Sequence, residues 1–218
     1  MLDEASEKLF GEPQWQNLTY WTGISSAGVY STAPFHIVHA GRGPLSLGMV
    51  KGPTLRHDAV PPFGFMIDRL VDAEILDATV LSPRAIREAQ LRKLVVNAMI
   101  NPLTVVYDCK NGQLFSDASR LARMKDLFLE TAQVVSGMMG NASNEAGDFT
   151  NELWEHVCSV GHATGENFSS MLQDVRAGRR TEIDYINGVI VKQGEQLGIP
   201  TPLNHELVQF VKQVGQDA

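Results

Sequence analysis

The sequence predicts an α/β protein in two parts, a β-rich region over residues 1–81 and an all-helical domain over residues 82–218. Short runs of aromatic and β-branched residues, separated by glycines and prolines, fill the first third of the chain. From Ser82 onward, apolar residues recur at helical spacing. With 218 residues and 44% hydrophobic content, the chain is long enough to bury a substantial core.

The first region is predicted to consist of short strands and one helix. Turn-forming residues bound each predicted strand, and the strands are expected at Trp21–Tyr30, Phe35–Val38, Leu45–Leu47 and Ile75–Leu81. A short helix is predicted over Phe63–Val71, and Pro53–Pro62 is predicted to be a loop. This pattern places a single helix between strands near the end of the region.

The helical domain opens at Ser82-Pro83, where a hydroxyl N-cap precedes proline at the first helical position. Pro102 is expected to kink or end this helix, because proline lacks an N–H group and clashes with the preceding turn. Residues 181–184 resemble a capping box, with Asp184 in place of the usual Glu or Gln. Further helices are predicted over 117–139, 150–163, 169–174, 183–197 and from 202 onward.

Composition excludes several classes of partner. The chain has 18 Lys and Arg against 25 Asp and Glu, a net charge of −7, which argues against nucleic-acid binding. Its apolar runs are too short for a membrane-spanning helix. Residues 1–7 are acidic and resemble neither a secretory signal nor a transit peptide, so a cytoplasmic location is expected. The two cysteines are far apart, and His36 and His39 lack a third ligand, so no metal site is predicted.

Lys93, Asn97 and Asn101 are spaced four residues apart, which puts them on one stripe of a helix. A lysine in line with two amides suits a substrate that carries a carbonyl and a carboxylate. The ammonium group can protonate a developing alkoxide, while the amides orient the acid. The alternative is an ordinary solvated face, since Arg87 and Glu88 lie close by. Spacing alone favours that alternative, because Lys and Asn are common surface residues.

Two further polar features have ordinary structural explanations. Asn167, Ser169 and Ser170 stand at a predicted helix start, where capping is the default role of such side chains. Glu182 stands in the predicted first turn of its helix, where the helix dipole stabilises a carboxylate. Taken singly, each of these residues is better explained by structure than by catalysis.

Two long blocks of sequence favour a functional role for these residues over a purely structural one. The first runs from Lys93 to Leu114 and the second from Asn167 to Pro202. Together they resemble the ketopantoate reductases (2-dehydropantoate 2-reductases), and the resemblance covers nearly the whole chain. It implies that residues 1–81 are the C-terminal part of a Rossmann-type NADP-binding domain. It also implies that residues 82–218 form an all-α domain, similar to the C-terminal helical bundle of 6-phosphogluconate dehydrogenase.

The family reaction is the NADPH-dependent reduction of 2-dehydropantoate, a small 2-oxo acid, to pantoate, a step toward coenzyme A. The resemblance implies that Lys93 is the proton donor. The residues that it implies for substrate binding are Asn97, Asn101, Asn111 and Ser170. Glu182 and Gly28 match positions on the cofactor side.

The front of the chain departs from the family. No strand–turn–helix with a G-x-G-x-x-G turn is present, although such glycines let the backbone approach a pyrophosphate. Three interpretations follow. The chain is a truncated reductase, or a non-catalytic homologue that keeps the helical domain for substrate binding or for a homodimer. The third interpretation, a generic helical interaction domain, would leave the two ordered blocks unexplained.

Overall fold

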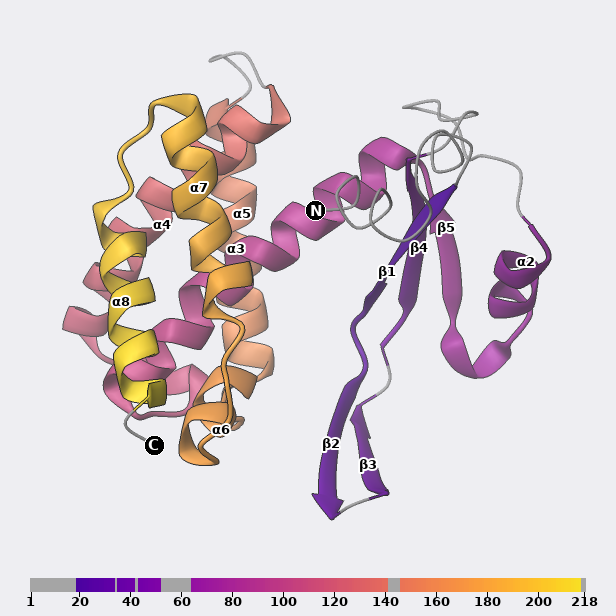
Figure 1. The fold of residues 1–218 in the computed structure, drawn as a ribbon, viewed down its shortest axis with the longest axis horizontal. Coiled ribbons are helices and arrows are strands. Elements are labelled where there is room, and N and C mark those ends of the chain that lie inside the picture. The colour runs from indigo at the N-terminus through magenta and orange to yellow at the C-terminus, as the bar shows by residue number, and fades with distance from the viewer. Residues whose placement is uncertain (1–18, 34, 42, 52–63, 141–145, 217–218) are drawn as a thin grey trace. The chain divides into compact units, whose positions relative to one another are not determined.

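The computed structural model describes residues 19–33, 35–41, 43–51, 64–140 and 146–216. The chain divides into two compact units, Met1–Gln90 and Leu91–Ala218, each of which is described by itself (Figure 1). The predicted boundary after Leu81 is the end of the last strand, two residues before a long helix begins at Pro83. The division between the units falls inside that helix.

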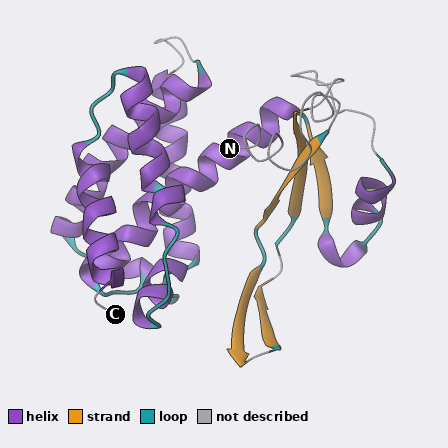
Figure 2. Ribbon diagram, viewed as in Figure 1, coloured by secondary structure: helices purple, strands orange, loops and turns teal. Residues whose placement is uncertain are grey.

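The first unit contains two small sheets (Figure 2). One sheet has the order β1-β4-β5, with β1 antiparallel and β5 parallel to the central β4. The other sheet is the antiparallel pair β2 and β3. The strand bounds are Tyr20–Ser25 for β1, Gly28–Ala33 for β2, His36–Gly41 for β3, Leu45–Lys51 for β4 and Ala78–Leu81 for β5.

The predicted strand Trp21–Tyr30 is two strands in the structure, β1 and β2. The hydroxyl of Ser25 accepts a hydrogen bond from the N–H of Ala27, at 3.4 Å, and this local turn separates them. The predicted strand Ile75–Leu81 begins late, because Glu74–Leu76 forms a 3₁₀ turn, η2, and Asp77 adopts a left-handed φ of 44°. Strand β5 therefore starts only at Ala78.

The short helix α2, Phe65–Val71, lies in the connection from β4 to β5. The predicted loop Pro53–Pro62 falls outside the described residues. Parallel strands joined through a helix form a β–α–β unit, the building element of dinucleotide-binding domains. The Rossmann-type origin of this unit remains a prediction.

The long helix α3 spans Pro83–Tyr107. The hydroxyl of Ser82 accepts a hydrogen bond from the N–H of Ala85, at 3.3 Å, as the N-cap prediction required. Of the two effects expected of Pro102, a kink or an end of the helix, the end does not occur, because α3 continues past Pro102 for five more residues. The Ala98 carbonyl, which Pro102 cannot bond, accepts a hydrogen bond from the side chain of Asn187 instead, at 3.1 Å.

The rest of the second unit is helical. Its longer helices are α4 (Ala118–Met139), α5 (Ala146–Ala163), α6 (Ser170–Arg176), α7 (Asn187–Leu197) and α8 (Pro202–Gln216), and its 3₁₀ turns are η3 (Asn111–Leu114) and η4 (Ile183–Tyr185). The Asp117 side chain caps α4, and left-handed Gly140 and Gly198 close α4 and α7. These ends agree with the predicted ones.

The predicted helix over 183–197 is interrupted. Ile186 has φ −112° and ψ −91°, which is not helical, so the segment divides into η4 and α7. The expected capping box at 181–184 does not form around a helix start, because Glu182 precedes η4 and makes no side-chain cap bond. Burial of both Ile183 and Ile186 accompanies the break, so tertiary packing overrides the local signal.

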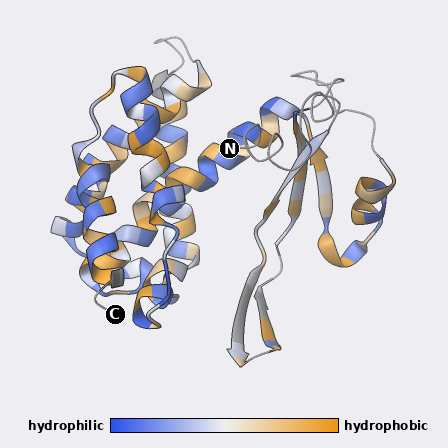
Figure 3. Ribbon diagram, viewed as in Figure 1, coloured by the Kyte–Doolittle hydropathy of each residue, from blue (hydrophilic) through white to orange (hydrophobic). Residues whose placement is uncertain are grey.

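In the described part of the second unit, 27 buried residues form one large apolar core. Apolar and polar stretches alternate along these helices, as expected when one side of each is buried (Figure 3). Val95 and Met99 of α3 and Leu153 of α5 are fully buried. Among the described residues, no helix is long and apolar enough to cross a membrane.

Candidate functional site

Helix α3 carries the predicted stripe of Lys93, Asn97 and Asn101 within the second unit. Because these residues follow one another at intervals of four along a continuous helix, they lie on one side of it. Lys93 is exposed, Asn97 is half-buried and Asn101 is only 8% exposed. The stripe therefore runs from solvent into the protein. A uniformly solvated face would not bury its last member.

The neighbouring Arg92 is held on another side of α3. Its guanidinium group forms an ion pair with Glu152 of α5 at 2.9 Å and lies 5.6 Å from the centre of the Phe149 ring. Burial lowers the pKa of His156, also on α5, and the positive charge of Arg92 lowers it further. The Arg92 side chain is therefore held against α5 by these contacts.

A chain of hydroxyl groups joins α3 to the start of α6. The Thr104 hydroxyl donates to the Asn101 carbonyl at 2.7 Å, and its oxygen lies 2.6 Å from the Ser169 hydroxyl oxygen. The Ser169 oxygen in turn accepts the N–H of Leu172 at 3.1 Å. Each hydroxyl has one proton, so Ser169 donates to Thr104. Ser170, which is exposed, directly follows this contact between α3 and the start of α6.

Asn111 fastens the turn η3 to the segment between α5 and α6. Its N–H donates to the Asn167 carbonyl and its side-chain amide to the Thr164 hydroxyl, both at 3.0 Å. Asn111 is 7% exposed, and its Oδ1 has no hydrogen-bond partner among the described residues. A buried carbonyl oxygen of this kind is an acceptor for a water or a polar ligand.

The two predicted cofactor residues lie in different units. Glu182 is exposed and precedes η4 in the second unit, five residues before Asn187, whose side chain contacts α3. Gly28 is exposed at the first residue of β2 in the first unit. All the predicted site residues except Gly28 lie in the second unit.

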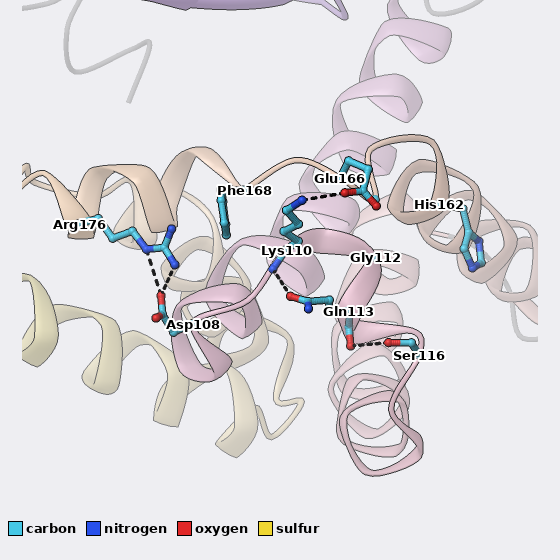
Figure 4. A pocket seen from close by; sticks show the side chains of 10 residues that line it. Asp108, Lys110, Gly112, Gln113, Ser116, His162, Glu166, Phe168 and Arg176 are labelled. Carbon is cyan, nitrogen blue, oxygen red and sulfur yellow. Dashed lines mark hydrogen bonds and ion pairs between the residues drawn. The ribbon is translucent and has the colours of Figure 1, made fainter.

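A pocket of about 660 Å³ opens at the far end of α3, beside η3 and the start of α6 (Figure 4). Lys110 pairs with Glu166 at 2.7 Å, and Arg176 pairs with Asp108 at 2.7 Å. The Arg176 guanidinium also lies 4.3 Å from the centre of the Phe168 ring. The hydrogen bond and charge of Lys110 lower the pKa of Glu166. The two cations are balanced by two carboxylates, so this pocket has no excess charge to attract an anion.

The sequence did not single out Thr104, the bridge to α6, or the side chains of this pocket. Thr104 could have been found from its place three residues after Asn101, since a helical Thr can bond back to the i−3 carbonyl. Lys110, Glu166 and Arg176 have no such signal. They meet only because the turn after α3 packs against the segment between α5 and α6.

The described glycines of the first unit do not form a G-x-G-x-x-G turn. A Cβ at Gly43 would lie 2.4 Å from the backbone of Ser26, so the space at Gly43 is filled by the chain itself. Gly28 differs, because its ideal Cβ would lie 3.5 Å from the Gly41 nitrogen, an ordinary van der Waals contact. Gly43 therefore allows two backbone segments to approach closely, whereas Gly28 has room for a side chain. In the described part of the chain, no three His, Cys, Asp or Glu side chains gather to hold a metal ion.

Fold and site define the class as a two-part protein whose helical domain presents an amine and amides along one helix. The family description "Ketopantoate reductase PanE/ApbA C terminal" matches residues 85–215. The chain belongs to the ketopantoate reductase family, which confirms the resemblance found in its sequence.

Named relatives agree with this assignment. The chain is 34% identical over 209 residues to a probable 2-dehydropantoate 2-reductase of Schizosaccharomyces pombe, covering 92% of the chain and 60% of the relative. It is 41% identical over 127 residues to the 2-dehydropantoate 2-reductase of Shigella flexneri, covering 58% of the chain and 39% of the relative. These relatives carry the name of an oxidoreductase, of which the chain spans 60% or less.

Solved structures share the fold. The crystal structure of the probable 2-dehydropantoate 2-reductase of Bacillus subtilis matches with a TM-score of 0.67 and 28% identity, over 90% of this chain and 61% of that one. A D-mandelate dehydrogenase with NADH and anilino(oxo)acetate matches with a TM-score of 0.74 over 90% of this chain and 60% of that one. At 23% identity, the second likeness shows the fold alone.

Proposed function

We propose that this polypeptide provides the substrate-binding and proton-donating part of a 2-dehydropantoate 2-reductase. The reaction converts the 2-oxo group of 2-dehydropantoate to the hydroxyl group of pantoate. The observation that carries the proposal is the α3 stripe, which leads from exposed Lys93 to buried Asn101 and adjoins the start of α6. The family membership of residues 85–215 supports it.

In this proposal Lys93 donates a proton to the carbonyl oxygen as that oxygen becomes an alkoxide. NADPH supplies the hydride in the family reaction. Asn97 and Asn101 hold the 2-oxo acid by their amides, and Ser170 contacts its carboxylate end. Asn111 contributes from η3, where its buried Oδ1 is an acceptor for a substrate hydroxyl.

Glu182 and Gly28 are proposed to lie on the cofactor side. The described residues include no G-x-G-x-x-G turn to hold a pyrophosphate. The same observation favours a second candidate function, a non-catalytic homologue that binds the 2-oxo acid, forms a homodimer, or does both. The two candidates share the substrate site and differ in turnover.

The first experiment measures binding and turnover with the purified 218-residue chain. NADPH is titrated by nucleotide fluorescence, and 2-dehydropantoate is titrated by calorimetry. Turnover supports the reductase, and substrate binding without turnover supports the non-catalytic homologue. Binding of neither compound contradicts the proposed site.

Lys93→Ala tests the proton donor, with Lys192→Ala, at an exposed position of α7, as the matched control. Where the wild type turns over, Lys93→Ala should reduce kcat by about 100-fold or more and leave the helical circular dichroism unchanged. Lys192→Ala should retain full activity. Unchanged turnover in a folded Lys93→Ala protein would remove the proton-donor assignment.

Glu182→Ala tests the cofactor side, with Glu195→Ala as the matched control. Loss of a charged hydrogen-bond partner is expected to raise the KM for NADPH by about tenfold. Equal effects of the two substitutions would contradict a site role for Glu182.

A further inference from the structure

We infer that Asn187 is a positioning residue for the α3 stripe. Its side-chain amide gives the Ala98 carbonyl the hydrogen bond that Pro102 cannot give, and this keeps Asn97 and Asn101 on one continuous helix. The substrate part of this inference rests on the function proposed for the stripe.

The interruption at Pro102 is a matter of helix chemistry. In an α-helix the N–H of each residue bonds the carbonyl four positions earlier, so the partner of Ala98 would be residue 102. Proline has no N–H group, and its ring crowds that same carbonyl. Ala98 is fully buried, and water therefore cannot serve its carbonyl. The Asn187 Nδ2 donates to it at 3.1 Å, from a different helix.

The position of this contact is what links it to the site. Ala98 directly follows Asn97, and Pro102 directly follows Asn101. The missing backbone bond therefore lies between the two amides that are proposed to hold the substrate. Any change in the bend of α3 at this point would move Lys93 and Asn97 relative to Asn101.

Asn187 is itself held in one orientation. Its Nδ2 also donates to the Asn204 Oδ1 at 2.9 Å, so both of its protons are used. The Asn204 Nδ2 donates to the Thr131 hydroxyl at 3.0 Å and to the Glu130 carboxylate at 2.8 Å. Asn187, Asn204 and Thr131 are fully buried. This network connects α3 to α4, α7 and α8 through hydrogen bonds that fix the orientation of the Asn187 side-chain amide.

Glu130 anchors the far end of the network. Its carboxylate accepts the N–H groups of Leu203 at 3.0 Å and Asn204 at 2.8 Å, in the first turn of α8. Free N–H groups at a helix start favour a carboxylate at this position. The N-terminus of α8 thereby fixes the position of Asn204, and Asn204 orients the Asn187 amide. This amide in turn bonds the Ala98 carbonyl of α3.

The Asn187 Oδ1 is buried and accepts no hydrogen bond from any described residue. The amide is thus used for its two donors and not for its acceptor. This asymmetry is expected of a residue whose task is to serve a carbonyl, since only a donor can satisfy Ala98.

The test is a double-mutant cycle between Asn187 and Pro102 in the full chain. Asn187→Ala is expected to weaken 2-dehydropantoate binding by about tenfold. Pro102→Ala restores an N–H at residue 102, so the double variant should recover most of the lost affinity. Asn151→Ala, on the exposed surface of α5, is the matched control and should bind as the wild type does.

A purely structural role gives a different pattern. If Asn187 serves only the Asn204 network, Pro102→Ala cannot rescue its loss, and this result would overturn the inference. So would wild-type affinity in a folded Asn187→Ala protein.

A second measurement does not depend on substrate. Amide hydrogen exchange over residues 97–103 should speed up by about tenfold in Asn187→Ala and return toward the wild-type rate in the double variant. If the wild type binds no 2-dehydropantoate, the proposed function fails, while exchange still decides whether Asn187 holds α3. Unchanged exchange in Asn187→Ala overturns the inference even if the stripe binds substrate.

Discussion

The two units differ in how they use their apolar residues. In the described part of the first unit, four apolar residues are buried, namely Leu47, Met49, Ile67 and Ile86. The described part of the second unit buries 27 in one connected core. Large apolar side chains such as Phe35, Phe65 and Ile75 are more than 80% exposed in the first unit. The helices of the second unit therefore bury one another's apolar faces, whereas the first unit leaves large apolar side chains of its helix and turns exposed.

The contrast extends to polar groups. The second unit can afford buried amides such as Asn187 and Asn204 because surrounding helices supply their hydrogen-bond partners. Two of its proposed substrate residues, Asn97 and Asn101, stand on α3, which packs into the core. The helical unit is therefore the independent scaffold of this chain, and four predictions test that conclusion.

The largest effect is expected when the parts are separated. Residues 82–218 should unfold cooperatively on heating, because they contain the whole of α3 and the complete core. Residues 1–81 should show no cooperative transition. Circular dichroism at 222 nm measures the first and near-ultraviolet spectra measure the second. A cooperative unfolding transition in the fragment of residues 1–81 would contradict this conclusion.

The core of the second unit should be sensitive to cavities. Leu153→Ala, at a fully buried position of α5, is expected to lower the free energy of unfolding by about 2–5 kcal/mol. Leu129→Ala, at a position that is 56% exposed, should change it by less than about 0.5 kcal/mol. Urea unfolding of both variants gives the comparison. Equal losses would show that burial in this unit does not determine stability.

A smaller loss is expected from overpacking. A Cβ at Gly161 of α5 would approach the Phe115 ring to within 2.1 Å, so Gly161→Ala should cost about 1–3 kcal/mol of unfolding free energy. Gly215→Ala meets no atom within 4 Å and serves as the control. Adding Phe115→Leu should restore part of the loss. If it does not, the contact between α5 and residue 115 is looser than the structure shows.

The smallest expected effect is a pH dependence from His156. Burial lowers its pKa in the folded protein, so the unfolded chain binds a proton first as the pH falls through about 6.5. Folding stability is then retained above that pH and decreases below it. Melting temperatures between pH 8 and pH 5 should fall more steeply for the wild type than for His156→Gln. Identical slopes would exclude His156 as a source of acid sensitivity.

Local signals in the sequence predicted much of the helical unit. Ser82 and Asp117 begin helices as caps, and Gly198 ends one, because capping depends on a few neighbouring residues. The capping-box prediction at 181–184 was wrong, because a 3₁₀ turn with a buried isoleucine forms there and no α-helix begins. The sequence left open whether Pro102 kinks or ends α3, and it could not show that the helix continues, because the compensating amide lies 85 residues away in the chain.

By itself the sequence determined the family, the division into a strand-rich and a helical part, and the spacing that aligns Lys93, Asn97 and Asn101. The tertiary structure alone decided that α3 passes Pro102 and that Thr104 meets Ser169. It also decided that Lys110, Glu166 and Arg176 share a pocket. The reason is physical. Helix periodicity and capping act over a few residues, whereas buried hydrogen-bond partners are supplied by segments that only packing brings together.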